Sequence, residues 1–390
     1  MRLNQSHLTY CTNVHRGETW AETFHSLQTH TLAIRRLVCP NKHYGIGLRL
    51  GNRAALELND HDTMREFRRW LDKNSCYVFT INGFAYGPFH GTRVKEDVYL
   101  PDWSSPERLF YTNYLFDLLS QLVPDGMEGS VSTLPGTFKG FHPTPEALKA
   151  MRSNIWKCVE HIAHVSQQCG RTLHLGVEPE PLCQLESSAE TLHFFDRMRG
   201  EHPNDPRLEE HLGVNYDTCH FAVEFEEPGD ALAALVNHDI KISKIHLSSA
   251  LKVRPTAEAR EELKKFTDDV YLHQVVVREV NGERSIYNDL PDALASEVYE
   301  EGCELPEWRI HFHVPLHAPA AAPFENTNDH LLGALDVLAE YPTICHHLEM
   351  ETYTWEVLPP ELKEQNVVDQ IAQEYEWTLT ELAKRGLASR

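Results

Sequence analysis

The stretch "RTLHLGVEPEP", residues 171 to 181, has the pattern of a buried strand that ends in two glutamates, Glu178 and Glu180. Burying a carboxylate without a partner is costly. A carboxylate at the tip of a buried parallel strand therefore needs a cation, a metal ion or a catalytic task. The proline between the two glutamates disturbs simple alternation, so the pattern leaves open which of them points inward.

Short apolar runs of this kind alternate with helical patterns along most of the chain. Candidate strands lie at 7–15, 44–51, 76–84, 129–136, 173–179, 212–220, 241–249 and 346–355. The segments 104–123, 144–170, 187–200 and 228–239 show helical spacing, and the first two open with clear helix start signals. Eight strands with intervening helices predict an α/β fold, a (β/α)8 TIM barrel. An open doubly wound sheet is the competing architecture, but no GxGxxG motif follows the first strand to support its dinucleotide-binding form.

One region, from about residue 252 to 325, breaks this rhythm. A charged helical segment is followed by alternating residues around Asn281 and Gly282, a pair that favours the tight turn of a β-hairpin. We interpret 252–325 as an insertion between the seventh and eighth strands that lies over the barrel mouth; the alternative is that it contains an extra barrel strand. Residues 360–390 have the pattern of a helical tail, and we interpret 1–390 as one domain.

Composition narrows the class of partner. The chain has 58 acidic and 36 basic residues and a formal net charge of −22, which disfavours nucleic acid and anionic membranes as partners. Its nine cysteines form no CxxC pair, so we expect reduced thiols. The N-terminal segment lacks the apolar run of a signal peptide, and no stretch approaches the roughly 18 apolar residues that span a bilayer. These features predict a cytoplasmic enzyme that acts on a small molecule, and the 24 histidines favour metal chemistry.

Acidic and imidazole side chains gather at the ends of four candidate strands: Glu178; Asp217 and His220; His246; and Glu349 and Glu351. In a TIM barrel the carboxyl ends of all strands open onto one face, where active sites are built. Mixed carboxylate and imidazole ligands suit one divalent ion such as Mn²⁺, Mg²⁺, Co²⁺ or Zn²⁺. The sequence therefore predicts a metal centre there. The alternative is a set of separate buried polar groups satisfied by hydrogen bonds.

The succession "VEP", "DTCH", "IHLS" and "ETY" on the fifth to eighth strands resembles the xylose-isomerase-like sugar isomerase and epimerase superfamily. The resemblance implies Glu178, Asp217, His246 and Glu351 as metal ligands and His220 as a substrate-facing histidine. Glu349 is two residues from Glu351 and stays an alternative ligand.

Longer segments look like the EboE-type "metabolite traffic" proteins of bacterial ebo clusters, which implies a role in secondary metabolism. These segments are "HLTYCTNVHRGETW", "FTINGFAYGPFHG", "VYLPDW", "HFHVPLH" and "ETYTWEVLP".

The chemistry of such a site leads to one main hypothesis and two alternatives. A metal ion that binds a carbonyl and an adjacent hydroxyl acidifies the C–H between them, and two opposed carboxylates can move that proton. We therefore expect a metal-dependent isomerase or epimerase of a sugar, sugar phosphate or cyclitol, with Glu178, Glu351 and His220 as catalytic residues. The alternatives are a metal-dependent hydrolase on the same barrel and a non-catalytic metabolite-binding protein, although a carrier would not need two opposed carboxylates.

Further polar residues are candidates for substrate binding, each with a structural role as the alternative: Asn13, His15, Asn82, Tyr86, His90, His273, Arg309, His311 and His313. His311 and His313 have strand spacing and could also form a second metal site. The basic residues that could bind a phosphate group of the substrate are Lys95, Lys139, Lys252 and Arg254.

Overall fold

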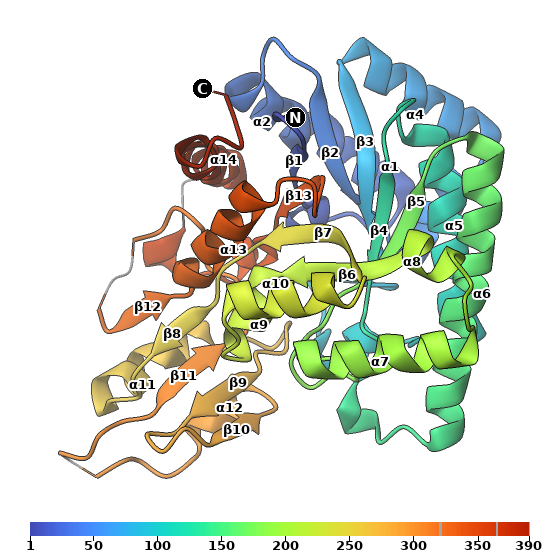
Figure 1. The fold of residues 1–390 in the computed structure, drawn as a ribbon. Coiled ribbons are helices and arrows are strands. Elements are labelled where there is room, and N and C mark those ends of the chain that lie inside the picture. The colour runs from blue at the N-terminus through green and yellow to red at the C-terminus, as the bar shows by residue number, and fades with distance from the viewer. Residues whose placement is uncertain (301, 320–321, 364–365, 390) are drawn as a thin grey trace.

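The computed structural model describes residues 1–300, 302–319, 322–363 and 366–389. Eight parallel strands form a nearly closed barrel in the order β1-β13-β7-β6-β5-β4-β3-β2 (Figure 1). A parallel bridge between Cys11 and Gly47 brings the two edge strands together. The barrel strands are β1 His7–Tyr10, β2 Tyr44–Arg49, β3 Cys76–Asn82, β4 Gly129–Thr133, β5 Leu173–Val177, β6 Leu212–Asp217, β7 Lys241–Leu247 and β13 His347–Met350. The predicted TIM barrel is confirmed, and the alternative prediction of an open doubly wound sheet is wrong.

Helices cover the outside of the barrel. They are α1 Trp20–Ser26, α2 Leu32–Val38, α3 Asn52–Leu58, α4 His61–Lys73, α5 Pro106–Leu122, α6 Pro145–Cys169, α7 Ser188–Glu201, α8 Arg207–His211, α9 Thr218–Val223, α10 Pro228–Asn237, α13 Asn328–Glu340 and α14 Val367–Lys384. Their ends follow local chemistry. Thr144 caps α6 through the backbone N–H of Ala147, and Gly170 ends this helix with φ at 69° in the left-handed region.

Short helical turns complete the connections: η1 Thr12–Val14, η2 Leu27–Thr31, η3 Lys95–Tyr99, η4 Lys139–Phe141, η5 Lys264–Phe266, η6 Tyr353–Glu356 and η7 Pro360–Leu362. The helical tail is α14, whose Tyr375 hydroxyl lies 2.9 Å from that of Tyr44 on β2. Among the helices in the described ranges, none combines the length and hydrophobicity needed to span a bilayer.

The insertion between β7 and β13 contains a sheet of its own, beside the barrel (Figure 1). Its antiparallel strands, in the order β10-β9-β11-β8-β12, are β8 Leu251–Val253, β9 Val275–Arg278, β10 Arg284–Tyr287, β11 Glu307–Ile310 and β12 Phe324–Asn326, with α11 Ala257–Leu263 and α12 Leu290–Leu294 beside them. The predicted helix and hairpin correspond to α11 and to β9 and β10. β13 pairs directly with β7, so the extra barrel strand considered from the sequence is wrong.

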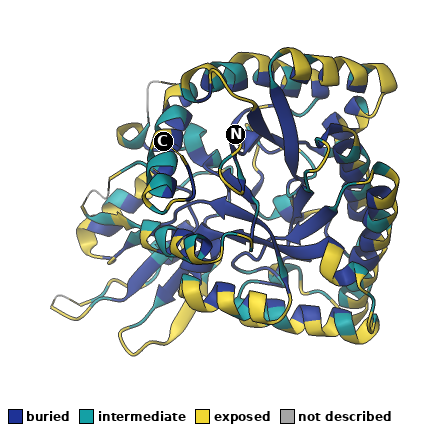
Figure 2. Ribbon diagram, turned by 45° about the horizontal axis from the view of Figure 1, so that its top comes forward, coloured by how far each residue is buried: buried dark blue, intermediate teal, exposed yellow. Residues whose placement is uncertain are grey.

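Burial explains why the barrel strands read as continuous apolar runs. Every residue of β2 to β6 is buried, whereas the long outer helices expose one face to solvent (Figure 2). Strands of a parallel sheet are covered on both faces, so alternation with polar residues is lost. The insertion has a separate apolar cluster that includes Leu263, Trp308 and Ile310.

Candidate metal centre

His246, near the end of β7, is held by Glu349 on the neighbouring strand β13. The Nε2 atom of His246 lies 2.9 Å from Glu349 Oε2, and this oxygen also accepts a 2.6 Å hydrogen bond from Lys244 Nζ. Burial disfavours the charged form of Glu349, but Lys244 and His246 outweigh it and lower the pKa to about 2. Because an ionised carboxylate only accepts, His246 carries a proton on Nε2, and its Nδ1 faces the other way.

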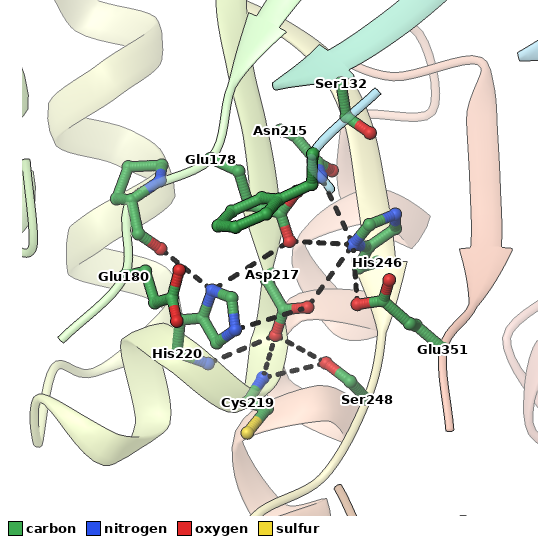
Figure 3. Close-up of polar contacts among 12 residues, drawn as sticks. Ser132, Glu178, Glu180, Asn215, Asp217, Cys219, His220, His246, Ser248 and Glu351 are labelled. Carbon is green, nitrogen blue, oxygen red and sulfur yellow. Dashed lines mark hydrogen bonds and ion pairs between the residues drawn. The ribbon is translucent and has the colours of Figure 1, made fainter. Parts of the chain in front are cut away.

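Three carboxylates surround this Nδ1 atom (Figure 3). It lies 3.1 Å from Glu178 Oε1, 3.3 Å from Asp217 Oδ2 and 3.2 Å from Glu351 Oε2. All four residues are buried, none more than 5% exposed. Burial opposes the charged imidazolium, but Glu351 and Glu178 outweigh it and hold the pKa of His246 well above its usual value. The cluster therefore attracts positive charge, as a proton or as a metal ion.

The two carboxylate oxygens of Asp217 have different surroundings. Oδ1 accepts hydrogen bonds from the backbone N–H groups of Cys219 and His220 at 2.7 and 3.1 Å and from Ser248 Oγ at 2.6 Å. Oδ2 points into the cluster and, within the described part of the chain, has no hydrogen-bond partner. Burial opposes its ionisation, but His220 and His246 keep the pKa of Asp217 well below its usual value.

Glu178 Oε2 is the other buried carboxylate oxygen around His246 Nδ1 that finds no hydrogen-bond partner among the described residues. Such oxygens are costly unless a cation neutralises them. The ligand atoms of Glu178, Asp217, His246 and Glu351 lie within 4.8 Å of one another. Three carboxylates and one imidazole are a donor set of divalent ions, so these residues fit a metal.

Glu351 is fixed by two amides that the sequence predicted as substrate ligands. Its Oε1 accepts hydrogen bonds from Asn13 Nδ2 at 2.8 Å and from Asn82 Nδ2 at 3.1 Å. Glu349 lies on the other side of His246, outside the four-residue group. Glu180, the other glutamate of the opening stretch, accepts a 2.7 Å hydrogen bond from Tyr99 instead, and burial raises its pKa to about 7.

A cavity of about 600 Å³, including its opening to solvent, lies above this group. Its lining contains Asn13, Asn82, Glu178, Glu180, His220, His311 and Glu351, the aromatic residues Phe84, Phe89, Tyr99, Tyr271 and Tyr353, and the basic residues Arg49 and Lys95. Tyr271, Leu272 and His311 belong to the insertion. The insertion therefore forms part of the wall at the barrel mouth.

Other predicted substrate ligands are not among the residues described as lining this cavity: His15, Tyr86, His90, His273, Arg309 and His313. His15 Nε2 lies 2.9 Å from the Tyr10 hydroxyl, and both ring nitrogens of His273 are engaged, by the His311 carbonyl and by Asp268. Arg309 donates to the Ala222 carbonyl at 2.6 Å. In each of these three residues, a structural partner occupies at least one of the groups that would bind substrate.

The four basic residues considered for a phosphate are all paired. Lys139 contacts Glu186 and Glu190 at 2.7 Å. The partners of the others are Asp289 for Lys95, Glu325 and Asp329 for Lys252, and Glu307 for Arg254.

Lys244 is a site residue that was not predicted from the sequence. The spacing of the sequence could have indicated it. Lys244 lies two residues before His246, and Glu349 lies two residues before Glu351, so each lies on the same face of its strand as the predicted ligand that follows it.

No protein-family model matches the chain, and neither does any curated protein. Solved structures match it in fold. A D-tagatose 3-epimerase-like protein is 12% identical, with 97% of this chain and 98% of that chain covered and a TM-score of 0.50. A protein from Anabaena variabilis assigned as a sugar phosphate isomerase/epimerase is 12% identical, with 98% and 99% covered and a TM-score of 0.50. The fold shared with these proteins is the TIM barrel.

Proposed function

We propose that this protein is a divalent-metal-dependent isomerase or epimerase of a sugar or cyclitol, whose metal ion is held by Glu178, Asp217, His246 and Glu351. The observation that carries the proposal is the convergence of three carboxylates on His246 Nδ1 at 3.1 to 3.3 Å, at the floor of a cavity. The reaction class is supported by the barrel shared with epimerase-like proteins.

Glu178 and Glu351 are the proton-transfer groups in this proposal. A bound divalent ion would polarise a substrate carbonyl and its neighbouring hydroxyl, which acidifies the C–H between them. Glu178 follows β5 and Glu351 follows β13, and β6 and β7 lie between these strands in the barrel. The two carboxylates can therefore address a substrate carbon from different sides, one removing the proton and the other returning it. Asn13 and Asn82 hold Glu351 in position for this task.

The cavity favours a substrate without a phosphate group. Its two basic lining residues are engaged: Arg49 donates to the carbonyls of Gly17 and Gly87, and Lys95 to Asp289 and the Asp268 carbonyl. The floor is acidic and repels a phosphate. Aromatic walls with a few polar groups at the base suit a small polyhydroxylated ligand.

We further propose that the chain is of the EboE type and acts in secondary metabolism. The segments that carry this resemblance supply Asn13, Asn82, Phe89, Tyr99 and Tyr353 to the cavity. A purely carrying role would leave the opposed Glu178 and Glu351 without a task, so we favour an enzyme.

The first experiment measures metal content. The purified protein, offered Mn²⁺, Co²⁺, Zn²⁺ or Mg²⁺, should retain an ion that Asp217→Asn and His246→Ala lose. His174→Gln, a buried histidine at the other end of β5, is the matched control and should retain it. Wild type without metal under every loading condition would end the proposal.

The second experiment tests the reaction. Metal-loaded protein is incubated with unphosphorylated ketoses, aldoses and ketocyclitols in D₂O, and exchange of the C–H beside the carbonyl is followed by NMR. Glu178→Gln and Glu351→Gln should each lower the exchange rate at least about 100-fold, the scale of a lost acid–base group. Full exchange in either variant would remove that residue from the mechanism, and metal binding without exchange in any sugar would favour the carrier or the hydrolase.

A further inference from the structure

Glu180, the second glutamate after β5, lines the cavity but does not belong to the four-residue group. It is 5% exposed, and one of its carboxylate oxygens lies within 4.8 Å of a ring nitrogen of both His220 and His311. In Figure 3 it lies beside His220, on the side away from His246. The four residues proposed to hold the metal ion therefore leave this buried carboxylate unused.

The two oxygen atoms of Glu180 have different partners. Oε1 accepts a 2.7 Å hydrogen bond from the Tyr99 hydroxyl, which itself accepts one from Gln274 Nε2 at 2.9 Å. Gln274 belongs to the insertion, so the insertion helps to fix the carboxylate. Oε2 has no hydrogen-bond partner among the described residues. An ionised carboxylate oxygen only accepts, so Oε2 needs a donor from a ligand.

The neighbours of this carboxylate supply hydrogen bonds but no cation. Tyr99 and Gln274 are neutral donors, and burying a carboxylate without a cation is costly. His220 could carry a charge, but its Nδ1 lies 2.9 Å from the Pro179 carbonyl and its Nε2 lies 3.1 Å from His311 Nε2. Both ring nitrogens of His220 are therefore engaged away from Oε2.

The charge of the whole cavity floor is negative. The two basic residues of its lining, Arg49 and Lys95, donate to other partners. The four-residue group contains three carboxylates, so a divalent ion there would leave the group with a negative charge. Glu180 adds a further carboxylate above it. A ligand that carries positive charge is therefore attracted to this cavity.

Aromatic rings line the cavity beside these carboxylates. Tyr99 and Phe84 meet edge to face with their centroids 6.1 Å apart, and Tyr271 and Tyr353 do so at 5.1 Å. The faces of such rings attract organic cations, and several rings together form the cages that bind ammonium groups. The lining thus combines an unpartnered carboxylate oxygen with surfaces that suit a cation.

We propose that the cavity binds a polyol that carries an ammonium group, an amino sugar or an aminocyclitol, and that Glu180 Oε2 accepts a hydrogen bond from this ammonium. The aromatic rings enclose the cation, and the carbonyl and its neighbouring hydroxyl face the four-residue group. The proposed function supplies the polyol part of this ligand, and the proposal rests on it to that extent. Glu180 is then a specificity-determining residue, because a hydroxyl in the same place leaves the buried charge unpaired.

The test uses pairs of probes in which an ammonium group replaces one hydroxyl. D-Glucosamine and kanosamine are compared with D-glucose, and scyllo-inosamine with scyllo-inositol, by ligand-observed NMR titration of the full-length protein in Mg²⁺. Wild type should bind at least one amine at least about tenfold more tightly than its hydroxyl counterpart. This comparison needs no variant. If no amine is bound more tightly than its counterpart, the proposal is wrong.

Glu180→Gln keeps the shape of the side chain and removes its charge, so this variant should lose the preference for the amine. Glu224→Gln is the matched control. Glu224 is also buried, at 6% exposed, with an oxygen that lacks a hydrogen-bond partner in the described ranges, and it is not among the residues described as lining the cavity. This control should keep the preference. A preference that persists in Glu180→Gln, or that both variants lose equally, would overturn the proposal.

Failure of this proposal can be told apart from failure of the proposed function. Absence of metal binding or of C–H exchange ends the isomerase proposal, whereas a preference for amines that depends on Glu180 stands without either. Exchange of neutral sugars by a protein with no preference for amines would have the opposite meaning. It would support the isomerase and overturn the ammonium site.

Discussion

Glu349 Oε2 accepts the Nε2 proton of His246 across neighbouring strands, at 2.9 Å, where the two residues are register partners of β13 and β7. This contact turns the Nδ1 atom toward Glu178, Asp217 and Glu351. The orientation of the proposed metal ligand is therefore set by a carboxylate that does not belong to the four-residue group. Lys244, at 2.6 Å, keeps that carboxylate ionised.

Replacing Glu349 by glutamine should weaken metal binding without removing a ligand. The amide no longer holds His246 in one tautomer, so we expect metal affinity to fall about 10- to 100-fold. The change also leaves Lys244 buried without its partner, which should lower the free energy of unfolding by about 3–5 kcal/mol. Chelator competition measures the first effect, and urea unfolding the second.

The double variant Lys244→Met/Glu349→Gln separates these effects. Removing the unpaired cation should restore most of the stability but none of the metal affinity, because His246 is still not held. If affinity returned together with stability, the loss in Glu349→Gln would reflect general loosening, and the orienting role of Glu349 would be wrong.

Gly47 on β2 leaves the space that the Glu349 carboxylate occupies. A Cβ at this position would lie 1.9 Å from Glu349 Oε1 and 2.8 Å from the Tyr10 carbonyl. Gly47→Ala should therefore displace Glu349, lower metal affinity at least about tenfold and destabilise the protein by about 1–3 kcal/mol. Gly87→Ala is the control, since a Cβ there meets nothing within 4 Å. Similar metal titrations for both variants would contradict this account.

The barrel and the position of its site were predictable from local patterns. All eight barrel strands lie within the predicted segments, because strands buried on both faces are continuous apolar runs bounded by helix signals. Glu178, Asp217, His246 and Glu351 could be grouped because each lies at the end of a strand, and in a TIM barrel these ends meet on one face.

What the sequence could not predict depends on non-local partners. Glu349 and Glu351 are two residues apart, so both face the same side of their strand. Only the folded structure shows that the ammonium group of Lys244 contacts Glu349. β8 and β12 have three residues each, too few for a periodic pattern, so the five-stranded sheet of the insertion was not expected. The contact of His311 with His220 spans 91 residues and depends on where that sheet places His311.

Lys95, on the barrel side of the cavity, binds the insertion through an ion pair and a hydrogen bond. Its Nζ contacts Asp289 Oδ2 and the Asp268 carbonyl at 2.7 Å, and the Lys95 side chain is 9% exposed. Lys95→Met leaves Asp289 without its cation, so we expect amide hydrogen exchange across 264–290 to accelerate about tenfold or more, with the barrel strands unchanged. Lys252→Met is the control, because its partners Glu325 and Asp329 are exposed. Unchanged exchange in Lys95→Met would show that the apolar contacts alone hold the insertion.

A buried glutamate in the C-terminal helix should make stability depend on pH. Burial raises the pKa of Glu374 from 4.5 to about 7, although Thr352 and Gln370 donate hydrogen bonds to it. Between these pH values the folded protein binds the proton more tightly than the unfolded chain. The stabilisation is complete below pH 4.5, decreases as the pH rises and is lost above about pH 7.

Glu374→Gln removes this titration, so the free energy of unfolding of wild type relative to the variant should fall by on the order of 3 kcal/mol between pH 5 and pH 8. Urea unfolding of both proteins across this range measures the difference directly. Glu376→Gln, on the exposed face of the same helix, is the control and should follow wild type at every pH. Parallel pH profiles of wild type and Glu374→Gln would contradict this prediction. They would mean that Glu374 ionises as easily in the folded protein as in the unfolded chain, because water reaches its carboxylate.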